Sequence, residues 1–274
     1  MKKITLVIIA IAGLFGFSTA FAGISQIRES NNQFGFQLVS TNVDYTETGD
    51  GILAPSGTLD TEKGPVPGYA LSISTMQDLW LGNDYLEAEY DHASGNTDYV
   101  GGLLGPPPTP YGSIVATSGA TLTNFSARYG AGLMVNDQAM LTPYLELGHH
   151  EWDREVNLGE LYTHNYYGIG VLGQYTPADR LVLSARAMFG HTFGSNIAIN
   201  GAFSGALGNS SLFKAGAAAD YVLVQNLHGS IGVDYTSFNY GISGVYPVGV
   251  GYVAWEPDSK TNYTTVRIGL GYGL

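Results

Sequence analysis

The chain has 274 residues, with 11 Lys and Arg, 23 Asp and Glu, and no cysteine, and its formal net charge at neutral pH is −12. This acidic balance repels phosphate-rich polymers and argues against a nucleic-acid-binding protein. The absence of cysteine excludes disulfide bonds and thiolate zinc sites.

Residues 1–22 have the features of a secretory signal peptide. Lys2 and Lys3 precede an apolar core at residues 4–17, and Ala20-Phe21-Ala22 fits a small-x-small cleavage site. The core is shorter than the ~20 residues that a spanning helix needs, so an amino-terminal anchor is the less favoured alternative. We therefore predict an exported mature domain at residues 23–274, with nine basic residues against 23 acidic ones.

Apolar residues at every second position predict ten strands in the mature chain. The predicted strands are residues 33–46, 68–76, 85–92, 121–136, 140–151, 165–176, 180–192, 211–224, 227–239 and 265–274. In the first of them the apolar parity changes between Leu38 and Val39, which predicts a β-bulge. Eight strands is the main alternative, because the first three segments alternate most weakly.

The last predicted strand has the clearest pattern. One face is wholly apolar, and the other carries Arg267 and three glycines. The apolar face consists of Val266, Ile268, Leu270, Tyr272 and Leu274. A transmembrane barrel turns such a face outward to lipid. The sequence therefore predicts an all-β fold, a transmembrane antiparallel up-and-down β-barrel.

The connections between the predicted strands alternate in length. Short turns fall at residues 79–84, 136–139, 177–179 and 225–226, and long loops at 47–66, 93–120, 152–164, 193–209 and 240–261. In outer-membrane barrels the short turns face the periplasm and the long loops face outside. This alternation predicts that both ends of the barrel domain are periplasmic.

The whole mature pattern resembles the small outer-membrane β-barrel proteins of Gram-negative bacteria, the group with OmpA-, opacity- and OmpX-type barrels. The carboxyl-terminal insertion signal of that group usually ends on an aromatic residue, whereas this chain ends on Leu274. The resemblance implies a location in the cell outer membrane. It also implies outer-membrane lipid, lipopolysaccharide and the barrel-insertion machinery as partners, with no cofactor, and it leaves the surface partner unspecified.

Charged side chains on the inward faces point to the function of the lumen. The predicted lumen network is Glu87, Glu89, Arg128, Glu146, Arg186, Lys214, Asp234 and Arg267, with Asp91 and Asp220 as further inward acids. Mixed charges in so narrow a barrel should pair and close the lumen, because unpaired buried charge is costly. We expect Glu87, Glu89 and Glu146 to pair with the three arginines. The alternative is a narrow porin-like channel for small solutes or cations.

Three motifs raise the question of chemistry. Residues 168–173 match the dinucleotide fingerprint, but they lie inside a predicted strand and read as small lumen-facing residues. Residues 149–153 read as a polar, aromatic rim, with a divalent-cation site or catalysis as alternatives. Asp91, His92, His150 and Asp153 are the candidates for an outer-mouth hydrolase of omptin type, and a lipid-modifying barrel enzyme would need a Ser-His-acid group. No residue matches the omptin motif convincingly, so we assign no catalytic and no metal-binding residues.

The predicted external loops carry most of the remaining acids and a stiff Pro-rich segment at residues 105–110. The loop acids are Glu47, Asp50, Asp60, Glu62, Asp153, Glu155, Glu160, Glu256 and Asp258. Divalent cations could bridge these acids to lipopolysaccharide phosphates. The sequence thus favours a non-enzymatic barrel that acts in membrane structure or in surface interaction through its loops.

Overall fold

The computed structural model describes residues 23–103, 109–156 and 158–274. The predicted signal peptide and most of the Pro-rich segment lie outside the described residues. Among those described, no helix has the length and apolar character needed to cross a membrane.

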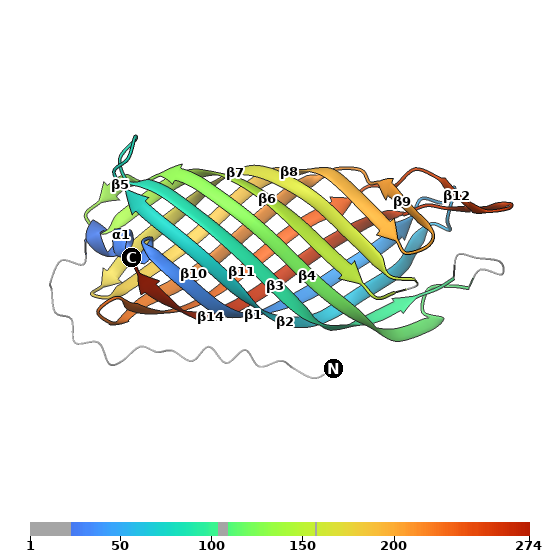
Figure 1. Ribbon diagram of the computed structural model, residues 1–274, viewed down its shortest axis with the longest axis horizontal. Helices are drawn as coiled ribbons and strands as arrows, with labels where there is room; N and C mark the ends of the chain where they lie inside the picture. The colour runs from blue at the N-terminus through green and yellow to red at the C-terminus, as the bar shows by residue number, and fades with distance from the viewer. Residues whose placement is uncertain (1–22, 104–108, 157) are drawn as a thin grey trace.

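Ten antiparallel strands form a closed barrel, as predicted (Figure 1). They are β1 (Gln33–Gly49), β2 (Gly57–Gln77), β3 (Asp84–Gly101), β4 (Ile114–Ala131), β6 (Ala139–Arg154), β7 (Glu160–Ala178), β8 (Leu181–Ile199), β10 (Ser211–Val224), β11 (Leu227–Tyr240) and β14 (Asp258–Gly273). Strand β1 pairs with both β2 and β14, and β8 pairs with β10. These pairings leave no open edge in the wall, so its backbone groups are satisfied within the sheet.

Five short elements are attached to the ends of this wall. Strand β5 (Leu133–Asn136) follows β4 after Gly132 and pairs with β6, and β9 (Phe203–Ala206) pairs with β8. Strands β12 (Tyr246–Gly249) and β13 (Tyr252–Ala254) form a separate two-stranded hairpin. The helix α1 (Ile24–Ser30) lies at the opposite end of the barrel from that hairpin (Figure 1).

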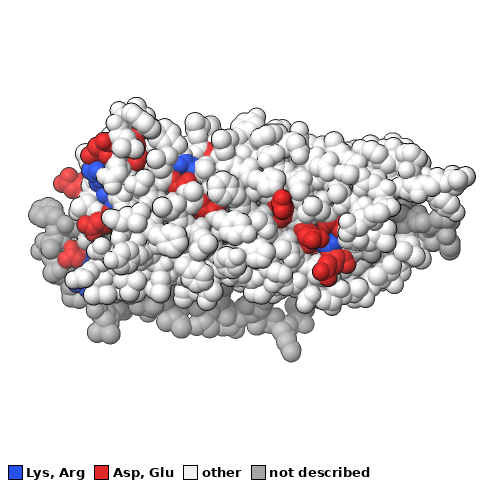
Figure 2. Space-filling view, in the orientation of Figure 1, with Lys and Arg blue, Asp and Glu red and all other residues white. Residues whose placement is uncertain are grey.

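The outer face of the wall is apolar along much of the barrel. Residues predicted to face lipid are exposed, as shown by Leu38 at 59%, Ile169 at 67% and Ile268 at 61% relative exposure. On the face shown in Figure 2, uncharged residues predominate along the barrel. A closed barrel that exposes apolar side chains in this way is suited to a lipid environment rather than to water.

The bulge predicted in the first strand is absent from β1. Its pairing with β14 runs without a shift from Gln33 to Thr48, and the odd-numbered residues face inward throughout. What changes is the environment: Val43 and Tyr45 are buried in the interior, whereas Asn42 is exposed on the outer face. We call the part of the wall with an apolar outer face the belt. Strand β1 continues beyond the belt into water, and there its apolar residues lie on the inner face.

Continuation of the strands beyond the belt also corrects the predicted loops. The first long loop, predicted at residues 47–66, is reduced to 50–56 because β1 ends at Gly49 and β2 begins at Gly57. Strand β3 likewise runs to Gly101, well into the predicted second loop. We call the end with these extensions the outer end, and the end with the short turns and α1 the periplasmic end, following the rule for outer-membrane barrels.

Candidate functional site: the barrel lumen

Arg128 lies at the centre of a group of ion pairs inside the barrel. Its Nε donates to Glu146 Oε2 at 2.8 Å, and its Nη1 donates to Glu87 Oε2 at 2.5 Å. Strand register places these acids directly opposite Arg128, one on β6 and one on β3. A third acid, Glu89, lies 3.8 Å from Nη2. The guanidinium is thus held by carboxylates from the strands on both sides.

Lys214 extends this group to the far wall. Its Nζ lies 2.7 Å from Glu146 Oε1 and 2.7 Å from the hydroxyl of Tyr166, and it sits 4.2 Å from the centre of the Tyr166 ring. Lys214 is on β10, whereas Glu146 is on β6. Because β7 and β8 separate these two strands in the sheet, the contact spans the interior.

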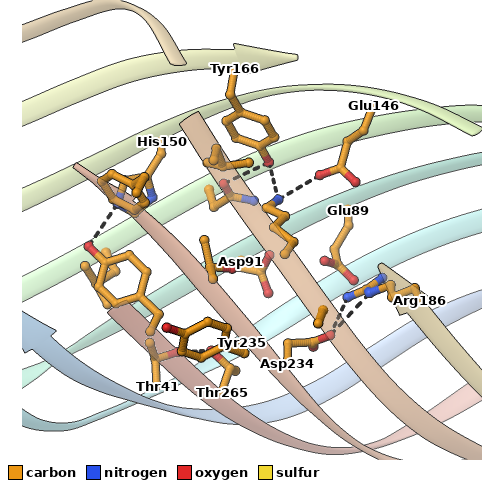
Figure 3. A pocket seen from close by; sticks show the side chains of 18 of the residues that line it. Thr41, Glu89, Asp91, Glu146, His150, Tyr166, Arg186, Asp234, Tyr235 and Thr265 are labelled. Atoms are coloured by element: carbon orange, nitrogen blue, oxygen red, sulfur yellow. Dashed lines mark hydrogen bonds and ion pairs between the residues drawn. The ribbon is translucent and has the colours of Figure 1, made fainter. Parts of the chain in front are cut away.

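Arg267 forms a second group of ion pairs. Its Nε lies 2.6 Å from Asp234 Oδ2, and its Nη1 lies 2.8 Å from Asp91 Oδ1. Arg186 also contacts Asp234, at 2.8 Å, so the acidic partner of Arg186 is an aspartate rather than one of the expected glutamates. Glu89 lies 3.6 Å from Arg267 and so joins the two groups. Figure 3 shows Glu89 beside the Arg186–Asp234 pair.

The structure thus brings all eight residues of the sequence-predicted network together, with Asp91 as a ninth member. We call these nine residues the ionic layer. Of the further inward acids, Asp220 lies elsewhere, towards the periplasmic end. There it accepts hydrogen bonds from His228, at 2.7 Å, and from Gln33, at 3.3 Å.

Two cavities lie on either side of the ionic layer. The outer cavity has a volume of about 90 Å³ and is also lined by Thr41, Asn124 and His150 (Figure 3). The periplasmic cavity has a volume of about 170 Å³ and is lined by small polar residues such as Ser72 and Ser184. Glu89, Arg186, Asp234 and Arg267 line both cavities, which places the ionic layer between them.

A layer of buried rings, which we call the ring layer, borders the outer cavity on its outer side. His164 Nδ1 lies 2.8 Å from the Tyr240 hydroxyl, and His150 Nε2 lies 3.2 Å from the Tyr263 hydroxyl. The ring centres of His164 and Phe238 are 4.6 Å apart. All five side chains are buried, so this layer packs like a small aromatic core.

Beyond the rings, a cluster of acids surrounds Arg154, which is fully buried. Its Nε lies 2.8 Å from Glu62 and its Nη1 lies 3.0 Å from Glu160. Asp60 lies 3.6 Å away, and the guanidinium carbon is 4.4 Å from the centre of the Tyr45 ring. The packing of a guanidinium against an aromatic face adds a cation–π attraction to the ion pairs.

Two further acids join the acids around Arg154, and we call this whole group the outer cluster. Glu47 accepts a hydrogen bond from the Tyr45 hydroxyl at 3.3 Å, and Glu256 accepts one from the Tyr162 hydroxyl. Glu256 belongs to the connection before β14, and burial together with the nearby Glu160 carboxylate raises the pKa of Glu256 to about 8.

The outer cluster overturns part of the loop assignment. Glu47, Asp60, Glu62, Glu160 and Glu256 were expected on exposed loops, available to bridge cations to lipopolysaccharide, but all five are buried. Arg154 was missed because the third loop was predicted to begin at residue 152. The signal was present in the sequence: Trp152 and Arg154 continue the inward parity of Glu146 and His150.

Helix α1 covers part of the lumen at the periplasmic end. Ile27 is fully buried, and the Asn31 side chain that follows the helix donates to Gln174 Oε1 at 2.7 Å. A helix of seven residues thus inserts one apolar side chain into this opening.

The candidates for hydrolase chemistry are not assembled into one site. Asp91 faces inward to Arg267, whereas His92 bonds to Thr123 at 3.3 Å from the neighbouring strand. His150 is held by Tyr263 inside the barrel, and Asp153 is exposed.

The other two motifs also lie in regular strands. His149 Nε2 lies 3.1 Å from Glu151 Oε1 on β6, and both side chains are partly exposed. The glycine-rich residues 168–173 lie within β7 rather than before a helix. In the part of the chain that the structure describes, no group of three or more His, Cys, Asp or Glu could hold a metal ion.

Comparison with known proteins gives no match to a family model and none to a curated protein sequence. Among solved structures, the chain is similar to the outer-membrane protease OmpT from Escherichia coli, with a TM-score of 0.59 and 10% identity over 90% of this chain and 97% of that one. The chain has the fold of an outer-membrane β-barrel protein. At this identity the likeness of the barrel to OmpT concerns the fold alone.

A second match is to the outer-membrane protein OprG from Pseudomonas aeruginosa, with a TM-score of 0.37 and 11% identity over 89% of this chain and 98% of that one. This score is too low to support an argument about the barrel. The assignment of the fold therefore rests on the closed wall and the likeness to OmpT, and the assignment to a membrane rests on the apolar outer face of the wall.

Proposed function

We propose that this barrel has a closed lumen and acts in membrane structure or surface interaction through its outer end. The observation that carries the proposal is the ionic layer, in which four cationic side chains meet five carboxylates between two cavities. Separating ion pairs with such short contacts inside a narrow barrel costs free energy, because each charge is then buried without a partner. The ring layer and the outer cluster add two further obstructions in series.

Closure of the lumen leaves the outer end as the part that meets the surroundings. Outer-membrane lipid and lipopolysaccharide remain the expected neighbours of the belt, and the barrel-insertion machinery the expected partner in assembly. Of the acids that could bridge cations to lipopolysaccharide, Asp50, Asp153, Glu155 and Asp258 are exposed.

The test is single-channel recording of the refolded protein in planar bilayers. A closed lumen predicts little or no conductance from the unmodified barrel. A stable, cation-selective conductance would replace the proposal with the porin-like channel. The Arg28→Ala protein is a matched control, because Arg28 pairs with Asp78 at the exposed periplasmic end, away from the ionic layer.

A gated channel is the second candidate, and the two cavities favour it. With these cavities between them, the ionic layer, the ring layer and the outer cluster would act as separate barriers along the barrel axis. In a gated barrel, Arg128→Ala combined with Arg267→Ala would raise the frequency of openings over the unmodified protein. A permanently closed barrel would stay silent in both forms, because the two outer layers would still block the path.

A further inference from the structure

The β12–β13 hairpin is an apolar arm that projects from the outer end of the barrel (Figure 1). Residues 241–255 contain no charged side chain. Val250 at the tip is 99% exposed, and Tyr252 and Val253 are 61% and 55% exposed. The arm lies beyond the lipid belt, so these side chains meet water, where exposed apolar groups that cluster commonly mark an interaction site.

The arm is held firmly to the barrel despite its exposure. The Tyr246 ring stacks on Phe203 of β9, with ring centres 4.9 Å apart and planes inclined by 15°. At its base, Ser243 N donates to the Glu256 carbonyl at 2.9 Å, and Ile242 N donates to Asp258 Oδ1 at 2.8 Å. A surface that is already ordered loses less conformational entropy when a partner binds.

Both outer edges of the hairpin are open to a further strand. Within the described residues, β12 and β13 pair with each other and with no other strand. An open edge offers backbone donors and acceptors to an extended segment, and the exposed valines offer apolar contacts to alternate side chains.

The charge of the surrounding surface limits the kind of segment that fits. Among the described residues of the outer end, five acids and two lysines are exposed: Asp50, Asp98, Asp153, Glu155, Asp258, Lys63 and Lys260. Such a surface repels a second copy of itself and an anionic lipid surface, and it attracts a cationic partner.

We propose that the β12–β13 hairpin docks an extended protein segment in which apolar residues alternate with Lys or Arg. The segment adds to an edge of the hairpin, with its apolar side chains on one face, beside either Tyr252 or Val253, and its cations towards the acidic surroundings. This inference rests on the proposed function, since it names the kind of partner that the outer end serves.

The test uses the full-length barrel refolded in detergent and two fluorescent synthetic peptides of equal length, one alternating Val and Lys and the other alternating Val and Glu. We expect the Val/Lys peptide to bind, with an affinity that falls as salt is added, and the Val/Glu peptide not to bind. Combined Val250→Ser, Tyr252→Ser and Val253→Ser should weaken binding by about tenfold or more. Val115→Ser is the matched control, because Val115 is also an exposed apolar residue at the outer end but lies on β4.

Absence of Val/Lys binding would overturn the inference, and so would equal binding of the two peptides or unchanged affinity in the triple variant. A dimer in sedimentation experiments that the triple variant abolishes would also overturn it, in favour of a second copy as the occupant. Conductance recorded on the same preparations keeps the two proposals apart. A conducting barrel that binds the Val/Lys peptide refutes only the closed lumen, and a silent barrel that does not bind it refutes only the docking.

Discussion

Arg128 and Glu146 face each other directly across the β4–β6 pairing, and the Arg128 Nε lies 2.8 Å from Glu146 Oε2 with both side chains buried. Glu146 also holds Lys214, and Arg128 also holds Glu87 and Glu89. This one pair therefore connects most of the ionic layer, and the loss of either member leaves several charges without a partner.

Arg128→Ala should lower the free energy of unfolding by ~3–5 kcal/mol, because it strands buried carboxylates. Urea unfolding of the barrel in lipid vesicles, followed by tryptophan fluorescence, measures this change. Arg28→Ala removes a pair of partly exposed side chains and should cost ~0–1 kcal/mol. A cost for Arg128→Ala as small as that of the control would mean that water fills the ionic layer and screens its charges.

Ala217 and Ala218 provide a test of the inward and outward faces of β10. Ala217 shares the parity of the exposed Phe213, whereas Ala218 shares that of Lys214, whose side chain enters the lumen. Ala217→Arg should cost ~2–4 kcal/mol near the bilayer midplane. Ala218→Arg should cost less, because both alanines border the periplasmic cavity but only Ala218 shares the inward parity of Lys214, so the new cation enters that cavity. Equal costs in vesicle refolding titrations would contradict this assignment.

The orientation of the barrel can be tested on intact cells, since the natural chain has no cysteine. Ser56 lies between β1 and β2, Asn209 lies before β10, and both are exposed. Cysteines introduced at these two positions should react with an impermeant thiol reagent. A cysteine at Asp137, in the turn between β5 and β6, should react only after the outer membrane is permeabilised. The opposite labelling pattern would reverse the assignment of the two ends.

The sequence predicts the ten-stranded wall and the inward charges because side-chain direction in a strand depends only on a local two-residue period. The pairs inside the lumen depend instead on strands far apart in the sheet. Arg267 on β14 meets Asp91 on β3, although β1 and β2 separate these two strands. Alternation alone cannot supply that relationship.

The acids of the outer cluster fall in predicted loops for a different reason. Prediction of lipid-facing strands assumes that apolar residues point outward, and this holds only within the belt. Beyond it, the wall continues in water with an interior of aromatic residues and acids, so Tyr45 and Glu62 were read as the end of a strand and part of a loop. The predicted strand ends at residue 151, whereas β6 continues to Arg154. Continuing the alternation over these three residues would have placed Arg154 on the inner face and so identified the cluster.

Glu256 gives the outer cluster a dependence on pH. The pKa of Glu256 is raised to about 8, mainly by burial and then by Glu160. Its neutral form is therefore the one that fits the closed arrangement beside Tyr162. The stability that this contributes is fully present below the usual carboxyl pKa of about 4.3 and is lost as the pH rises through about 8. Above that pH Glu256 adds a negative charge to the buried acids around Arg154, and the base of the β12–β13 arm should loosen.

A spin label on Val250→Cys should report this change as an increase in mobility between pH 6 and pH 9, centred near the raised pKa of Glu256. Glu256→Gln keeps a neutral side chain at every pH, so the same label should then show no transition. The control is a label at Ser56→Cys, in the connection between β1 and β2, away from the arm. A transition that persists in the Glu256→Gln protein would assign the titration to another member of the outer cluster, because the arm would then be responding to a charge that Glu256 does not carry.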